Sequence, residues 1–121
     1  MSKPNYVWMF DPNSGGVKIP AKEQKQICEQ ILQYVSIIAP EVRVDIKFRG
    51  QFCYLSTREE TKQNCPMIMP VCRLRHFRID KWSVALYSYG SDKYEPCILE
   101  SGKWDGLLEE ALKIGNLYLD N

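Results

Sequence analysis

The sequence has no apolar run that approaches the roughly 20 residues needed to span a membrane. Its first ten residues are too polar and too short to form the hydrophobic region of a signal peptide. It has five cysteines, an odd number, and no CxxC motif. We therefore expect a cytoplasmic protein that does not associate with membranes, with free and mostly buried thiols in a reducing compartment.

The sequence also lacks an excess of charge of one sign. Its 16 basic and 15 acidic residues leave a net charge of +1, which does not support a dominant electrostatic partner such as duplex DNA. The charge is nevertheless uneven, because residues 41–81 carry nine basic and five acidic side chains, a local excess of +4. The middle of the chain is therefore mildly basic and the last third acidic.

Motifs with a defined chemistry are missing as well. The sequence contains no glycine-rich phosphate loop, nucleophile elbow or paired acid–base spacing. His76 is the only histidine, and on an extended strand it would lie about 13 Å from Cys72, too far for both to bind one zinc ion. Cys65, before Pro66, is the thiol we expect to be exposed, but no histidine is placed to activate it. We therefore expect no metal, no cofactor and no catalytic residue.

Two segments have the apolar spacing of amphipathic helices. The first is residues 21–39, which Pro20 and Pro40 bracket at the two ends. The second covers about residues 107–119, with Asp105 as its expected N-cap and two glutamates near its start. Gly115 lies inside this helix at a cost of roughly 1 kcal/mol relative to alanine, which a close approach to the sheet would explain.

The segments between the helices alternate in polarity, as half-buried antiparallel strands do. We predict strands over residues 42–49, 52–56, 71–77 and 82–89, with a short fifth strand over 94–99 at an edge because of Pro96. Gly50 is expected at the first reversal. Residues 57–70, polar and then bracketed by prolines, are predicted to form a long loop. A short edge strand is also expected over residues 6–10.

These elements predict an α+β fold, a two-layer sandwich in which an antiparallel meander of four to five strands is flanked by an N-terminal and a C-terminal helix (α-β-β-β-β-α). We expect an N-terminal arm over residues 1–20 and a single domain over residues 21–121. Both helices should cover one face of the sheet. Arg73 and Arg75 should point to the other face, because side chains alternate along a strand.

The stretch of residues 71–96 has the densest cluster of large side chains, and we predict a binding surface there. The candidate binding residues are Arg73, Arg75, Trp82, Tyr87, Tyr89 and Tyr94. Such residues on a sheet can form a protein interface, stack single-stranded bases, or pair with one another across strands. We expect a non-enzymatic module that binds a protein partner or a second copy of itself. A single-stranded nucleic-acid-binding module, and a small enzyme with a pocket between the 57–70 loop and the last helix, are the alternatives.

Several short stretches resemble a family of small bacterial, often cyanobacterial, proteins. The stretches are residues 48–54, 70–75, 82, 87–89 and 94–96, with 107–111 and 117–119 in the predicted last helix. The resemblance covers roughly residues 42–119. The family has no assigned activity, so the resemblance implies a compact cytosolic domain and transfers no catalytic residue.

Overall fold

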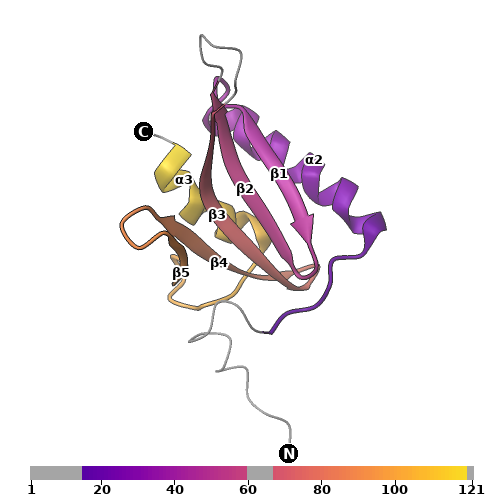
Figure 1. The fold of residues 1–121 in the computed structure, drawn as a ribbon. Coiled ribbons are helices and arrows are strands. Elements are labelled where there is room, and N and C mark those ends of the chain that lie inside the picture. The colour runs from indigo at the N-terminus through magenta and orange to yellow at the C-terminus, as the bar shows by residue number, and fades with distance from the viewer. Residues whose placement is uncertain (1–14, 60–66, 120–121) are drawn as a thin grey trace, which may run out of the picture.

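The computed structural model describes residues 15–59 and 67–119, and in this part of the chain two helices pack on a five-stranded antiparallel sheet (Figure 1). The helices are α2 (Ala21–Ile38) and α3 (Leu108–Leu119). The strands are β1 (Val44–Arg49), β2 (Phe52–Glu59), β3 (Met67–Arg78), β4 (Lys81–Ser88) and β5 (Lys93–Cys97). They lie in the sheet in chain order, and the predicted α+β arrangement with a helix before and after the strands is confirmed.

Helix α2 forms where the sequence predicts it. It buries Ile27, Ile31 and Val35, which lie one turn apart on the side that faces the sheet. Pro20 is the N-cap, with φ −60° and ψ 142°, so its fixed φ leads directly into the first helical residue. The helix ends one residue earlier than predicted, because Ala39 precedes Pro40 and has left the helical region.

Asp105 does not cap helix α3, and this part of the sequence-based prediction is wrong. The backbone N–H of Leu107 instead donates to Oε1 of Glu110 at 2.9 Å, as in the backward half of a capping box. The carboxylate of Asp105 lies 3.7 Å from Nζ of Lys81 on β4. Glu110 suits the cap because it is the third residue of the helix, from which its side chain reaches back over the first turn.

The hydrophobic core lies between the two helices and the sheet face that they cover. Cys53, Leu74 and Val84 face one another across β2, β3 and β4 and are fully or almost fully buried. Helix α3 approaches this layer closely at Gly115, where an added Cβ would lie 3.1 Å from Sγ of Cys72. The predicted reason for a glycine at this position is therefore confirmed.

Strands β2 and β3 are longer than the sequence predicts. β2 continues to Glu59 and β3 begins at Met67, so the predicted loop over residues 57–70 is wrong at both of its ends. Pro70 fits inside β3 because the register shifts there and leaves Val71 as an extra residue. A bulge of this kind tolerates a residue that has no N–H to donate.

Residues 15–20 run along the end of the sheet before α2 begins. The N–H of Val17 donates to the carbonyl of His76 at 2.7 Å, and the N–H of Ile19 donates to the carbonyl of Gly50 at 3.0 Å. Gly50 has φ 60° in the turn between β1 and β2, as expected for a tight hairpin. The strand predicted over residues 6–10 lies outside the described residues.

Candidate functional site

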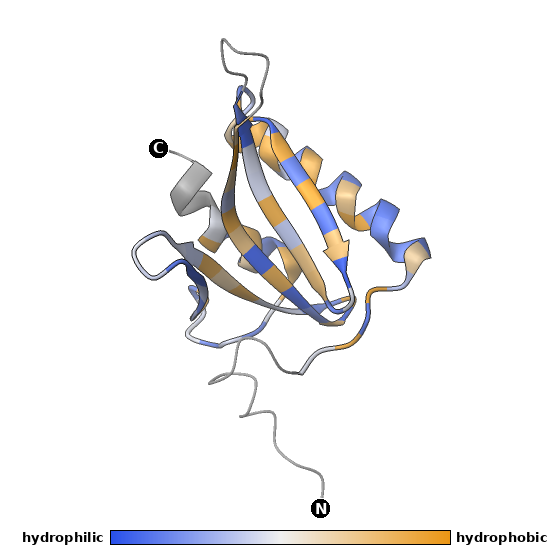
Figure 2. Cartoon of the chain, viewed as in Figure 1, coloured by the Kyte–Doolittle hydropathy of each residue, from blue (hydrophilic) through white to orange (hydrophobic). Residues whose placement is uncertain are grey.

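Neither of the two described helices covers the second face of the sheet, which we call the open face (Figure 1). The register defines it by rows of opposed residues. These are Lys47, Tyr54, Arg73, Ala85 and Pro96; Arg49, Phe52, Arg75 and Ser83; and Tyr87 and Tyr94. Figure 2 shows the alternation that separates the two faces most clearly along β1. Arg73 and Arg75 therefore point away from the helices, as predicted.

Arg73 lies between two aromatic rings on the open face. Its guanidinium carbon is 4.3 Å from the centroid of the Phe52 ring and 4.9 Å from that of Tyr94. Only 7% of Arg73 is exposed. Each cation–π contact of this kind stabilises a fold by about 0.5–2 kcal/mol, more when it is desolvated. Arg73 on β3 therefore contacts one ring from β2 and one from β5, and it offers little surface to a partner.

Arg75 is buried even further, with 4% of the residue exposed. Its Nε donates to Oγ of Ser83 on β4 at 3.3 Å, and its guanidinium lies 5.6 Å from the centroid of Phe77. Gly16 lies against its stem, because a Cβ added there would be 3.0 Å from Cγ of Arg75. The sequence predicted the direction of both arginines but not their burial.

An aromatic row crosses the open face. Its members in spatial order are Phe52, Tyr54, Tyr94, Tyr87 and Tyr89. Neighbouring ring centroids are 6.0, 5.8, 5.1 and 4.8 Å apart, and every pair is tilted or edge-on. These are favourable geometries for aromatic pairs, so each ring of the row stabilises its neighbours. The structure thus brings together the predicted residues Tyr87, Tyr89 and Tyr94.

Phe52 belongs to the aromatic row but was not singled out from the sequence. Tyr54 also belongs to it, and although the sequence allows it on the open face, it is not among the candidate binding residues. Both lie on β2, and the register places Tyr54 opposite Arg73 and Phe52 opposite Arg75. A sequence-based alignment that places the β1–β2 turn at Gly50 and then pairs β2 with β3 would identify them. The bulge at Val71 hides this pairing, because it shifts the register by one residue.

The row ends at Tyr89, which is 56% exposed. Its hydroxyl donates to the carbonyl of Pro70 at 2.7 Å, and the hydroxyl of Tyr87 donates to the carboxylate of Asp92. Partial burial raises the pKa of Tyr94, with smaller contributions from neighbours including Tyr54. The two hydrogen bonds hold Tyr87 and Tyr89 at this end of the row without burying them.

A shallow hollow of about 550 Å³ adjoins this part of the row. It is lined by Arg73, Tyr87, Asp92, Lys93, Tyr94, Glu95 and Pro96. Both signs of charge are present at its rim, and the ring faces supply its apolar surface. A mixed rim around an aromatic centre is the composition typical of a protein-binding surface.

Trp82 does not belong to the open face, although the sequence analysis included it among the candidate binding residues. It lies on the face that the helices cover and is completely buried. Its indole N–H donates to the carbonyl of Ile79 at 3.2 Å, and its ring lies 4.8 Å from that of His76. Its backbone pairs with that of Gly106 through two hydrogen bonds of 2.7 and 2.9 Å. Trp82 is thus part of the core.

His76 is buried on the same covered face. Its Nδ1 lies 2.9 Å from the carbonyl oxygen of Val17, and because a carbonyl can only accept, this nitrogen carries the proton. Its Nε2 lies 3.8 Å from Oε1 of Glu23 on α2. Within residues 15–59 and 67–119, no three histidine, cysteine, aspartate or glutamate side chains come together as a metal site. Cys65, the other candidate discussed for metal or thiol chemistry, lies outside the described residues.

The described cysteines Cys28, Cys53, Cys72 and Cys97 are free thiols. Burial raises the pKa of Cys72 to about 12 and raises that of Cys53 still further. A thiol is nucleophilic only as the thiolate, so these two groups are unreactive in the folded protein at neutral pH.

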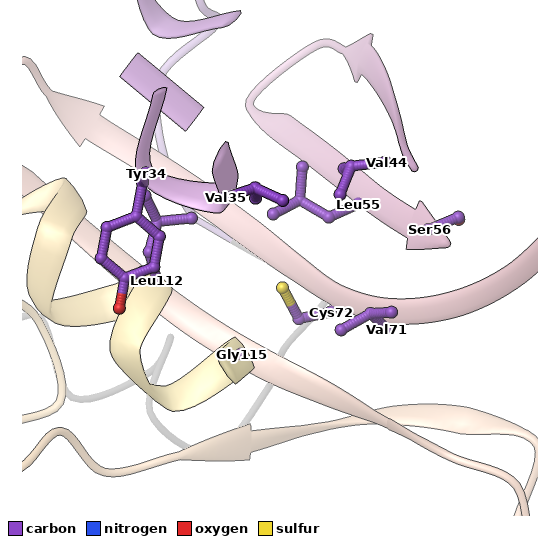
Figure 3. A pocket seen from close by; sticks show the side chains of 9 residues that line it. All are labelled: Tyr34, Val35, Val44, Leu55, Ser56, Val71, Cys72, Leu112 and Gly115. Carbon is purple, nitrogen blue, oxygen red and sulfur yellow. The ribbon is translucent and has the colours of Figure 1, made fainter. Parts of the chain in front are cut away.

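A small hollow lies between α2, α3 and the sheet (Figure 3). Its lining includes Val35, Leu55, Val71 and Leu112, and it has room for about one water molecule at most. None of its described lining residues carries a charge, so it brings no acid–base pair together. This is the region where the sequence left open an enzyme pocket, and its described part is a gap in the apolar packing.

Neither described helix combines the length and the apolar character that a transmembrane span requires. Comparisons of the chain with protein-family models, with curated proteins and with solved structures gave no match. The site is therefore interpreted from its own chemistry.

Proposed function

We propose that this chain is a non-enzymatic module that binds a protein partner, or a second copy of itself, through the aromatic row of the open face. The observation that carries the proposal is the continuous contact of four tyrosines, from Tyr54 through Tyr94 and Tyr87 to the exposed Tyr89. Tyrosine is enriched at protein interfaces because its large, rigid ring loses little conformational entropy on binding.

The position of Arg73 favours a protein partner over single-stranded nucleic acid. A base stacks on the free face of an aromatic ring, but the guanidinium of Arg73 already lies over Phe52 and Tyr94. Arg73 and Arg75 are also too buried to lie along a phosphate backbone. Lys47 and Arg49 remain exposed at the β1 edge of the open face, and they are the basic groups that would support the alternative.

Crosslinking from single positions tests the protein-binding proposal. Tyr89 is replaced by the photoreactive p-benzoylphenylalanine, and Leu32, which is 50% exposed on α2, receives the same replacement as a matched control. We expect a specific adduct from position 89 and none from position 32. Tyr54→Ala introduced together with the probe should weaken that adduct severalfold. Equal labelling from both positions, or a protein that stays monomeric up to about 1 mM with no adduct, would contradict the proposal.

The nucleic-acid alternative is tested with a labelled single-stranded RNA of about 12 nucleotides. The alternative requires a rise in fluorescence anisotropy at about 50 mM salt that is lost at about 200 mM. It also requires the rise to be lost in the Lys47→Ala/Arg49→Ala variant. The Arg73→Ala/Arg75→Ala variant is measured in the same way and shows whether the two buried arginines also contribute to RNA binding. No binding at the lower salt concentration eliminates the alternative.

A cytoplasmic location is also part of the proposal. It is supported by the free thiols of Cys28, Cys53, Cys72 and Cys97, since free cysteines are typical of a reducing compartment. Counting reactive thiols in the denatured protein, purified from its native cell without reductant, tests it. Fewer thiols than cysteines would indicate a disulfide and an oxidising compartment.

A further inference from the structure

The helix layer has an apolar groove of its own, separate from the open face. The groove lies between α2 and α3, has a volume of about 470 Å³, and is also lined by the β3–β4 turn. Tyr34 and Ile37 line it from α2, Ile79 from the turn, and Leu107 and Leu112 from the start of α3.

Three of the apolar side chains in this groove are largely in solvent. Ile37 is 73% exposed, and Ile79 and Leu107 are each 52% exposed. They come from three separate segments of the chain and yet line one hollow. Single exposed apolar residues are common on protein surfaces, whereas a shared concave patch of this kind is typical of a binding groove.

The charge around the groove is negative. Asp80 and Glu109 line it, and among its described lining residues there is no lysine or arginine. Asp80 is paired with Arg78 at 3.0 Å, but Glu109 forms no ion pair with another described residue. The pKa of Tyr34, which lines the groove, is raised first by burial and then by the charges of Glu109 and Glu100.

The shape of the groove fits a helix. Its α2 wall runs from Gln30 through Gln33 and Tyr34 to Ile37, which are positions i, i+3, i+4 and i+7 on two turns. Such a wall is about 10 Å long. An amphipathic helix presents apolar side chains at the same spacing, and laying that stripe into a groove between two helices is a common mode of recognition.

A second copy of the chain is a poor occupant of this groove. A symmetric dimer would bury the same patch of both copies, so two Glu109 carboxylates would enter one interface whose described lining residues include no lysine or arginine. Like charges opposed at an interface disfavour it. The charge of the groove instead matches basic side chains.

We propose that the groove between α2 and α3 binds an amphipathic helix of a partner protein. The apolar stripe of that helix contacts Ile37, Ile79 and Leu107, and its flanking lysine or arginine side chains lie near Glu109. The proposal is independent of the open face, so the chain would bring two partners together on opposite sides of one sheet.

Two labelled peptides of about 14 residues test this proposal with the full-length protein. Both carry leucines at helical spacing, and the flanking positions are lysine in one and glutamate in the other. We expect the lysine peptide to bind at least about tenfold more tightly at about 50 mM salt, with a smaller difference at about 500 mM. Anisotropy gives the affinities, and amide chemical shifts show where the peptide binds.

Variants of groove residues distinguish specific binding of the peptide in the groove from non-specific electrostatic attraction. Ile37→Asp should lower the affinity for the lysine peptide at least about tenfold. Leu32→Asp, an exposed change on the same helix outside the groove, should change this affinity less than about twofold. Glu109→Lys should reverse the preference between the peptides. Tyr89→Ala, which alters the open face, should leave both affinities unchanged.

Three outcomes would overturn the proposal. The first is a lysine peptide that binds Ile37→Asp as tightly as the unaltered protein. The second is equal binding of the two peptides. The third is a dimer, seen by sedimentation, that Ile37→Asp dissociates, because the groove would then hold a second copy. Circular dichroism of each variant confirms that the compared proteins are folded.

Discussion

The two faces of the sheet bury their side chains in different ways. On the covered face, Leu74 and Trp82 are completely buried beneath two helices. On the open face, Arg73 and Arg75 are only 7% and 4% exposed, although neither described helix lies over them. Arg73 lies against the rings of Phe52 and Tyr94, and the stem of Arg75 lies against Gly16, because an arginine stem can cover apolar surface while its head makes polar or cation–π contacts. The two arginines are therefore buried by rings and backbone, whereas the covered face is buried by helices.

The covered face should show the larger effect when one side chain is removed. Trp82→Ala deletes a fully buried ring and its hydrogen bond to the carbonyl of Ile79, so we expect a loss of about 3–5 kcal/mol in the free energy of unfolding. Urea unfolding followed by circular dichroism measures it. Leu32→Ala, at a position 50% exposed, is the control and should cost less than about 0.5 kcal/mol. Similar losses in the two variants would mean that Trp82 is not in the core.

Gly106 tests how tightly the covered face is closed next to Trp82. A Cβ added there would lie 2.9 Å from Cδ1 of the buried Leu99 and even closer to Oε1 of Glu110. Gly106→Ala should therefore cost about 1–3 kcal/mol, measured by urea unfolding. Gly102→Ala is unsuitable as a control because Gly102 has φ 87°, whereas Gly90→Ala meets nothing within 4 Å and should be far milder. Equal costs at positions 90 and 106 would contradict the close packing.

The open face should lose stability when its buried arginine is shortened. Arg73→Ala removes two cation–π contacts, with Phe52 and Tyr94, and we expect a loss of about 1–2 kcal/mol. Lys47→Ala is the matched control, because Lys47 lies in the same row of the sheet but is exposed, and it should cost less than about 0.5 kcal/mol. Urea titration gives both values. If Arg73→Ala were as mild as Lys47→Ala, the open face would be an ordinary solvated surface.

A further effect on stability is expected from pH, through the thiols of the covered face. The pKa of Cys72 is raised from 9.0 to about 12, so the folded state holds its proton more tightly than the unfolded state does. The contribution to stability is complete below pH 9 and is lost as the pH rises from about 9 to about 12, by at most about 1.4 kcal/mol per pH unit. Urea unfolding between pH 8 and 11 follows this loss.

The Cys72→Ala variant provides the control for this pH dependence. Its stability is lower at every pH because a buried sulfur is missing, but its slope above pH 9 should be shallower than that of the unaltered protein. Cys53 also contributes to the fall of stability with pH, since burial raises its pKa as well. The Cys53→Ala/Cys72→Ala variant should therefore show an even smaller change of unfolding free energy with pH. Parallel slopes in all three proteins would show that the thiols ionise equally in both states.

Local patterns in the sequence predict the elements and the direction of each side chain. The stripe of α2, the alternation of β1 and the proline at the edge of β5 each follow from one residue type at one spacing. Pleat geometry also places Arg73 and Arg75 on the correct face. Each of these predictions depends on residues that are close together in the chain, which is why they succeed.

The rest depends on contacts between distant residues. Pro70 lies within β3 only because a bulge opposite β2 accommodates it, and no local rule anticipates that. Glu110 bonds the N–H of Leu107 at the start of α3, whereas Asp105 lies near Lys81 of β4, a strand distant in the chain. The burial of Arg73 requires Phe52 and Tyr94, which the fold brings from either side. Alternation gives the direction of a side chain but not what lies over it.

The backbone pair between Trp82 and Gly106 also limits growth of the sheet from its edges. The side of β4 away from β3 is paired with two segments: residues 84–88 pair with β5, and Trp82 pairs with Gly106. β5 carries Pro96, and β1, at the opposite edge, alternates charged residues along its length, two features that discourage strand addition and fibril growth. Neither edge of the sheet therefore favours the addition of a further strand, and the aromatic row lies on a face of the sheet instead of along an edge.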